Sequence, residues 1–315
     1  IVFRGYVAKA LEEHLNISRE HLSHLVKPIE QWPQFEIRAL QIDEHATRLY
    51  FSFDGWCLDG WSYQILFRDL VTLYQNPKAP LPSVDLSFRD YVLAVQNLET
   101  SLAFQHSLEY WQKRIPSLPP APELPLAINP KTLEKPRFRR YSQQLPSEIW
   151  QRLKTRAQKS KLTPTALLMA VYAEVLTLWS KTPHFTINVP RFNRLPLHPQ
   201  VNEIIGEFAS FTLLEIDNSK SDSFEVRAQN LQRQLWQDLE HQYVSGVRVL
   251  REIAKFQNVE TAGVSFPVVF TTAPQDIRKD VCSVKGTSLG TLGHIVEALS
   301  QTPQVHIDNI YFEEA

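Results

Sequence analysis

The 315-residue sequence has little cysteine, no excess of charge of either sign and no long uninterrupted apolar run. Its two cysteines, Cys57 and Cys282, lie far apart and outside any CxxC pattern, which argues against both a disulfide framework and a zinc site. This usage fits a reducing compartment, so we expect a cytoplasmic location. No secretory signal is present, and because the first residue is Ile1 we expect the chain to be a piece of something longer.

The charged residues are balanced, with 33 Lys and Arg against 34 Asp and Glu. This balance gives no electrostatic reason to expect binding to nucleic acid or to an acidic membrane. The longest apolar stretch, residues 166–180, contains Glu174 and predicts a buried helix rather than a membrane span.

Several well-known catalytic motifs are missing. The sequence has no GxxxxGK[ST] or GxGxxG phosphate loop, no GxSxG nucleophile turn and no HExxH metal motif. None of its ten histidines belongs to a pair at ligand spacing, so no metal site is predicted. An enzyme built from this sequence must use carboxylates, hydroxyls and amides.

Hydrophobic periodicity predicts strands and helices in both halves of the chain, and therefore an α/β or α+β fold with two lobes. Apolar and polar residues alternate along 35–42 and 48–54, which predicts the two strands of a hairpin. The apolar residues of 61–75 recur at helical spacing. Further helices are predicted at 87–98, 101–115, 146–160, 162–180 and 221–242, and further strands at 137–145, 185–189, 210–217, 266–272 and 304–312.

A proline-rich segment gives the clearest boundary. Residues 115–136 contain seven prolines in 22 residues, which disfavours both helix and central strand. We expect an N-terminal lobe at 1–114, an inter-lobe linker at 115–136 and a C-terminal lobe at 137–315.

The stretch FDGWCLDGWS, residues 53–62, places two acids five residues apart where the hairpin gives way to a helix. Asp and Gly are common turn residues, and Asp59 or Ser62 could cap the helix that follows. Read alone, the stretch is a turn.

Six motifs in order across residues 54–308 nevertheless resemble those of heterocyclization domains of nonribosomal peptide synthetases, within the condensation-domain superfamily. DGWCLDGWS fits the D-x4-D-x2-S signature. The others are PSLPPAPELPLA, LTPTALLMAVYAEVLTLWS, FNRLPLHPQVNEIIGEF, FPVVFTT and SQTPQVHID.

The resemblance implies two lobes like those of chloramphenicol acetyltransferase, a pseudo-dimer in a V around a central tunnel. Carrier proteins would deliver substrates on 4′-phosphopantetheine arms, with no directly bound cofactor. The implied reaction joins an upstream acyl thioester to carrier-bound Cys, Ser or Thr and then cyclodehydrates the product to a thiazoline or oxazoline. Ordinary condensation domains carry HHxxxDG at this turn, whereas Asp54 and Gly55 stand here at the two histidine positions.

Residue roles follow from the same motifs. Thr271 and Asp308 are the implied catalytic pair, and Asn193 could orient the substrate amide. Asp54 and Asp59 are expected to hold structure. A buried carboxylate needs a cation, and Arg194 is the expected partner of Asp59. Ser62 is expected in the first helical turn, without a direct chemical role.

Departures from the family pattern leave alternatives open. Glu207 and Ala209 replace an acid and a hydroxyl residue, Asn309 follows Asp308, and the family's opening motif is missing, so we expect an incomplete N-terminal lobe. The chain could condense without cyclizing, or serve as a catalytically silent docking module for carrier proteins. Expected partners are the upstream and downstream carrier proteins and an adjacent adenylation domain, with the excised domain monomeric.

Overall fold

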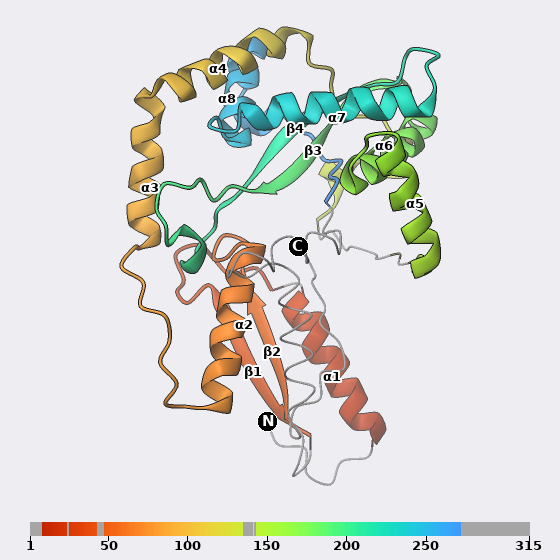
Figure 1. The fold of residues 1–315 in the computed structure, drawn as a ribbon. Coiled ribbons are helices and arrows are strands. Elements are labelled where there is room, and N and C mark those ends of the chain that lie inside the picture. Colours follow the sequence, from red (N-terminus) through yellow and green to blue (C-terminus); the bar gives the residue numbers. More distant parts are fainter. Residues whose placement is uncertain (1–7, 24, 43–46, 135–140, 142, 272–315) are drawn as a thin grey trace. The chain divides into compact units, whose positions relative to one another are not determined.

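A computed structural model describes residues 8–23, 25–42, 47–134, 141 and 143–271, and the chain divides into two compact units (Figure 1). The described part of the first unit comprises residues 8–91 and 194–208, and that of the second comprises 92–193 and 209–271. The chain thus leaves the first unit after Tyr91, returns to it at Arg194 and leaves again after Phe208.

The first unit is built on a hairpin of β1 (Phe35–Gln41) and β2 (Thr47–Phe53), antiparallel with Phe35 opposite Phe53. Successive strand residues face opposite sides. Leu40 and Tyr50 therefore face α1 (Ala8–Ser23), where they pack with Leu15. On the other side, rings of β2 contact rings of α2 (Gly60–Gln75), Phe51 against Phe67 and Phe53 against Tyr63.

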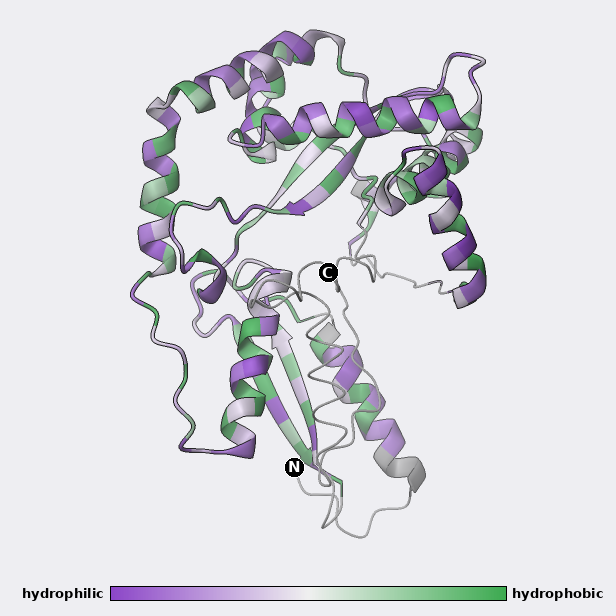
Figure 2. Ribbon diagram, in the orientation of Figure 1, coloured by the Kyte–Doolittle hydropathy of each residue, from purple (hydrophilic) through white to green (hydrophobic). Residues whose placement is uncertain are grey.

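The second unit is a helix–sheet–helix sandwich around β3 (His184–Phe192) and β4 (Ala209–Asp217), which pair antiparallel with Ile187 opposite Leu214. One face packs on α5 (Ser147–Lys159), α6 (Pro164–Trp179) and α7 (Phe224–Glu240). The other face, which includes Leu213, packs on α4 (Leu102–Arg114) and α8 (Gly246–Gln257). Hydrophobic and hydrophilic residues alternate along α4 and α7, as helices with one buried side require (Figure 2).

The remaining elements are a helix at the unit boundary and short 3₁₀ turns: α3 (Phe88–Asn97), η1 (Leu98–Thr100), η2 (Ile115–Ser117), η3 (Pro130–Thr132), η4 (Val201–Glu203) and η5 (Thr261–Gly263).

The proline-rich segment lies inside the second unit, whereas the sequence led us to expect a linker between lobes there. It follows the edge of β3 that faces away from β4. The Thr186 N–H donates to the carbonyl of Pro120 at 2.8 Å, and the Thr186 hydroxyl donates to that of Pro119 at 2.7 Å. Proline lacks an N–H but keeps its carbonyl, so an edge position that only accepts hydrogen bonds suits it.

Most predicted elements are present. The hairpin, the two strands of the second unit and the predicted helices agree within a few residues, and Thr163 caps α6 as expected, accepting from the Ala166 N–H at 3.1 Å. The predicted strand at 266–272 is reduced to one parallel bridge between Asn188 and Val269. The described residues of 137–145 are not a strand, and 304–312 lies outside the described residues. Two helices, α1 and α8, were not predicted.

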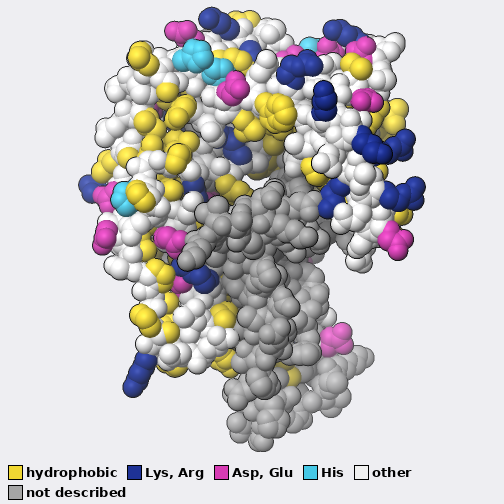
Figure 3. Space-filling view, in the orientation of Figure 1, with side chains coloured by type: hydrophobic (Ala, Val, Ile, Leu, Met, Phe, Trp, Pro, Cys, Tyr) yellow, Lys and Arg dark blue, Asp and Glu magenta, His cyan; other side chains and the backbone are white. Residues whose placement is uncertain are grey.

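The face drawn in Figure 3 mixes basic and acidic side chains, with basic ones densest over α5, in keeping with the near-zero net charge. Within the described residues no single helix could cross a membrane by length and composition, although α5 and α6, bent by 98°, pass that test as a pair.

Candidate functional site

The turn between β2 and α2 carries the two acids of the D-x4-D-x2-S motif. Asp54 follows β2 directly, its backbone N–H donating to the Gln34 carbonyl at 3.1 Å and its carbonyl accepting from the Cys57 N–H at 2.9 Å. Its side chain is partly buried, and a Cβ built on the neighbouring Gly55 would meet nothing within 4 Å. The turn therefore has open space where ordinary condensation domains are expected to carry a histidine.

Asp59 has a different environment, because its side chain is fully buried. It caps α2, accepting at Oδ1 from the Ser62 N–H at 2.8 Å and from the Ser62 hydroxyl at 2.7 Å. Arg194 donates from Nη2 to Oδ1 at 2.9 Å and from Nε to Oδ2 at 3.2 Å. The predicted pairing of Asp59 with Arg194 is confirmed.

Arg194 uses all five of its N–H donors. Besides Asp59 it donates from Nη2 to the Ser62 hydroxyl at 2.9 Å, and from Nη1 to the carbonyls of Val201 and Ile204 at 2.8 and 2.9 Å. Its guanidinium carbon lies 3.8 Å from the centre of the Phe208 ring, close enough for a cation–π contact.

Ser62 lies in the first turn of α2, as predicted, but its hydroxyl does more than that position requires. It has donor contacts to Asp59 and to the Gly206 carbonyl at 2.9 Å, and it accepts from Arg194 and from the Gly206 N–H at 3.0 Å. The Asp59 N–H also donates to the Gly206 carbonyl at 3.0 Å. Sequence reasoning missed Gly206, and its place in the quoted GEF motif was the available signal.

These contacts decide what Asp59 can do chemically. Both of its oxygens already accept hydrogen bonds from Arg194 or Ser62, and the carboxylate is sealed from solvent. A general base needs a free acceptor within reach of the proton that it removes. We therefore interpret Asp59, Ser62, Arg194 and Gly206 as a clamp that holds residues 194–208 on the strand-to-helix turn.

Asn193 directly follows β3 and is the last residue before the chain returns to the first unit. Its side-chain oxygen accepts a hydrogen bond from Nη1 of Arg191 at 2.8 Å. The same guanidinium donates to the side-chain oxygen and to the backbone carbonyl of Gln242, at 3.1 and 2.9 Å. Sequence reasoning did not single out Arg191.

Thr271 is exposed and directly follows the residues that pair with β3. The Asn188 N–H donates to the Val268 carbonyl and the Asn188 carbonyl accepts from the Phe270 N–H, both at 2.9 Å. Because the bridge is parallel, the chain runs from Val269 to Thr271 in the same direction as β3 runs from Asn188 towards Asn193. Asp308, the other member of the implied catalytic pair, lies outside the described residues.

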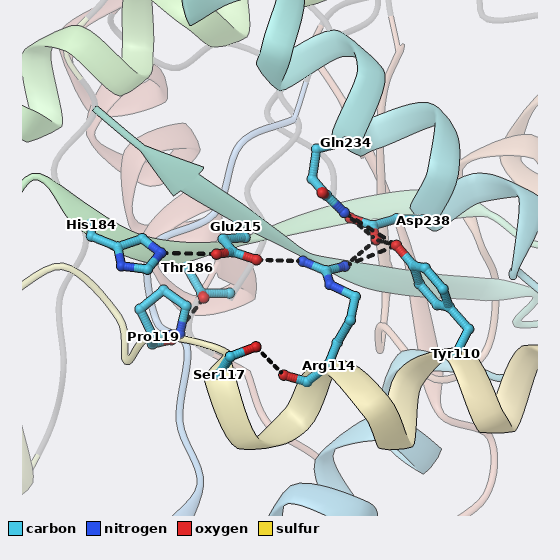
Figure 4. Close-up of polar contacts among 9 residues, drawn as sticks. All are labelled: Tyr110, Arg114, Ser117, Pro119, His184, Thr186, Glu215, Gln234 and Asp238. Carbon is cyan, nitrogen blue, oxygen red and sulfur yellow. Dashed lines mark hydrogen bonds and ion pairs between the residues drawn. The ribbon is translucent and has the colours of Figure 1, made fainter. Parts of the chain in front are cut away.

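A second polar cluster, in the second unit, joins α4, β3, β4 and α7 (Figure 4). Arg114 forms ion pairs with Asp238 and, at 2.8 Å, with Glu215, which also contacts His184 at 2.8 Å. Tyr110 donates its hydroxyl proton to Asp238 at 2.7 Å. Gln234 donates to the Asp238 carboxylate at 3.0 Å.

The titrating groups of this cluster are displaced from their ordinary pKa values. Burial raises the pKa of Asp238 to about 6, although Arg114, Tyr110 and Gln234 act in the opposite direction. One Asp238 oxygen, Oδ2, is buried with no partner among the described residues, which disfavours the charged form. Burial, and next the Asp238 charge, raises the pKa of Tyr110 to about 12.

Such shifts occur at catalytic sites and also in structural ion-pair networks. Arg114 is mostly buried, and its charged partners come from β4 and α7. We interpret the cluster as a cross-link between the helices on the two faces of the sheet. Among the described residues, no group of three or more His, Cys, Asp or Glu side chains could hold a metal ion.

Comparison with known proteins agrees with this geometry. The Condensation domain family model matches residues 11–299. Bacitracin synthase 1 of Bacillus licheniformis is 35% identical over 311 residues, covering 98% of this chain and 6% of that protein. Phenyloxazoline synthase MbtB of Mycobacterium tuberculosis is 32% identical over 276 residues, covering 87% of this chain and 19% of that protein.

A solved structure, the EpoB nonribosomal peptide synthetase cyclization-docking bidomain of Sorangium cellulosum, is 42% identical with a TM-score of 0.78. It covers 87% of this chain and 55% of that one. This chain therefore spans only a small part of the curated relatives that it matches. The predicted α/β fold class is confirmed, and so is the resemblance to heterocyclization domains. The chain belongs to the condensation-domain family.

Proposed function

We propose that the chain is a heterocyclization domain of a nonribosomal peptide synthetase. The amino group of a downstream Cys, Ser or Thr thioester attacks the upstream acyl thioester carbonyl, forming an amide and releasing the upstream thiol. The side-chain thiol or hydroxyl then attacks that amide carbonyl, and loss of water leaves a thiazoline or oxazoline.

The strand-to-helix turn carries this proposal. Residues 54–62 contain no histidine, Gly55 borders open space, and the buried acid Asp59 is saturated by its clamp partners. The turn thus lacks the histidine expected of an ordinary condensation domain. The similarity to a cyclization bidomain and to a phenyloxazoline synthase supports the same reading.

The acid–base chemistry falls to Thr271, Asp308 and Asn193, the residues that match the family's motifs. A carboxylate beside a positioned hydroxyl can take the proton of the nucleophile and return one to the departing oxygen. Thr271 is exposed at the end of a sheet edge, as a residue that meets a substrate must be.

The substrates arrive on the 4′-phosphopantetheine arms of upstream and downstream carrier proteins, with no directly bound cofactor. An adjacent adenylation domain supplies the activated amino acid, in the cytoplasm, and the isolated domain is monomeric.

Intact-mass analysis of the downstream carrier tests the proposal. The domain is mixed with an acyl-loaded upstream carrier and, in turn, with a Cys-, Ser- or Thr-loaded downstream carrier. An adduct lighter than the linear dipeptide by one water supports cyclodehydration, and Thr271→Ala and Asp308→Ala should then stop at the linear mass. Thr155→Ala, at an exposed threonine of α5, is the matched control.

A condensation-only domain is the second candidate, favoured by Glu207 and Ala209 in the GEFAS motif. It predicts the linear mass alone with all three downstream carriers. No adduct with any of them would favour a silent carrier-protein docking module.

A further inference from the structure

The Arg191 guanidinium has hydrogen-bond partners besides Asn193. It lies in β3 opposite Ser210 of β4, and two of its hydrogen bonds go to Gln242 in the connection between α7 and α8. The connection ends at a tightly packed residue, the first of α8, because a Cβ built on Gly246 would lie 2.4 Å from the backbone oxygen of Phe211. The guanidinium is thus held by Gln242 as well as by its contact with Asn193.

Arginine can only donate hydrogen bonds. The side-chain atom of Asn193 that lies 2.8 Å from Arg191 Nη1 must therefore be its carbonyl oxygen, whichever way the amide is drawn. Since the amide is planar, its NH₂ group is directed to the opposite side.

We propose that Arg191 is a positioning residue that holds Asn193 as a hydrogen-bond donor to the carbonyl oxygen of the carrier-bound substrate. This inference rests on the proposed function and deepens it. The acyl carbonyl oxygen gains negative charge when the amine attacks, and the amide oxygen does so again when the side-chain nucleophile attacks. A donor fixed at that oxygen stabilises both transition states.

The proposal gives Asn193 and Arg191 different roles, donor and positioning residue, which two substitutions can separate. Asn193→Asp keeps an acceptor for Arg191 but removes both N–H donors. Arg191→Met keeps the donors but removes the hydrogen bond through which Arg191 orients the amide. A role limited to packing would not separate these two variants.

The measurement is the single-turnover rate of adduct formation on the downstream carrier, followed by intact mass at several carrier concentrations. We expect Asn193→Asp to lower the rate constant at saturating carrier about a hundredfold. Arg191→Met should lower it roughly tenfold with the half-saturating carrier concentration unchanged, as for loss of one charged hydrogen bond. Arg191→Lys keeps a donor and should recover most of the rate.

A double-mutant cycle shows whether Arg191 acts through Asn193. In the Asn193→Ala background, Arg191→Met should cause no further loss. Arg233→Met on α7 is the control and should react at the wild-type rate, because Arg233 is exposed and its side chain donates to its own helix neighbour Asn230. Thermal unfolding of each variant checks that it is folded, and Arg191→Leu, which also removes the donor, replaces Arg191→Met should the latter fail to fold.

Two results would overturn the inference while the wild-type domain still forms product. One is full activity of Asn193→Asp. The other is a tenfold effect of Arg191→Met that persists undiminished in the Asn193→Ala background. A wild-type domain that forms no adduct would instead overturn the proposed function itself.

Discussion

The Asp59 carboxylate and the Arg194 guanidinium, 135 residues apart in sequence, form a two-point ion pair that is almost fully buried. The pair ties the strand-to-helix turn to residues 194–208, which the chain contributes to the first unit between β3 and β4 of the second. One interaction therefore joins two of the six motifs on which the resemblance rests, D-x4-D-x2-S and the one that begins with FNR.

Removing one member of this pair should be costly. Asp59→Ala leaves the Arg194 charge buried with no counterion, and we expect a loss of about 3–5 kcal/mol in the free energy of unfolding. Urea denaturation of the purified domain measures the loss. A double variant, Asp59→Leu with Arg194→Met, removes both charges and should lose less than Asp59→Ala does.

The same variant separates a structural role from a catalytic one. If Asp59→Ala stayed as stable as the wild type yet formed no adduct on the downstream carrier, the clamp interpretation would be wrong. Asp85→Ala, at an exposed acid of the same unit, is the matched control and should leave stability unchanged within about 0.5 kcal/mol.

The pair could be predicted from sequence because the argument was chemical: a carboxylate expected to be buried needs a cation, and an FNR motif supplied one. The other contacts of Asp59 and Arg194 could not be predicted in this way. Ser62 and Gly206 are 144 residues apart, and neither hydrophobic periodicity nor turn chemistry indicates that a serine hydroxyl will meet a glycine backbone. Contacts of this kind depend on how distant segments pack.

Ser62→Ala tests the contribution of the Ser62 hydroxyl, whose contacts the sequence did not predict. The substitution leaves two donors, the Gly206 N–H and one Arg194 N–H, without their buried acceptor, so we expect a loss of at least about 2 kcal/mol in the free energy of unfolding. Ser101→Ala removes a serine that caps α4 by a single hydrogen bond and should cost only about 1 kcal/mol. Equal losses for the two variants in urea denaturation would contradict the four-contact role of Ser62.

Two glycines of the first unit should respond oppositely to alanine. A Cβ at Gly206 would lie 2.3 Å from the ring of Phe88, which packs against Phe208, so Gly206→Ala must displace the rings beneath Arg194. We expect a loss of about 1–3 kcal/mol, as in other overpacked sites. Gly55→Ala meets open space and should change stability by no more than roughly 0.5 kcal/mol. A neutral Gly206→Ala in thermal or urea unfolding would contradict the tight contact.

The cluster around Arg114 marks a second limit of sequence reasoning. Arg114, Glu215 and Asp238 belong to α4, β4 and α7, and nothing in the sequence around each one indicates its partners. The hydrophobic pattern correctly predicts these three elements. It does not say that α4 and α7, on opposite faces of the sheet, will share one arginine.

Asp238 should make stability depend on pH in the direction opposite to most carboxylates. Its pKa is raised by burial from 3.8 to about 6, so the folded state holds the proton more tightly than the unfolded chain does. The stabilising contribution is therefore complete below about pH 4 and is lost as pH rises through 6, with a total change of roughly 3 kcal/mol.

The free energy of unfolding, measured in urea from pH 4 to pH 7.5 for the wild type and Asp238→Asn, should give a difference that falls with rising pH. Asp217→Asn is the control: hydrogen bonds from Ser219 lower the Asp217 pKa, so its contribution is lost only below about pH 4 and its difference from the wild type should stay constant over this range. A wild-type advantage over Asp238→Asn that grew between pH 4 and pH 7 would show that Arg114 outweighs burial at Asp238.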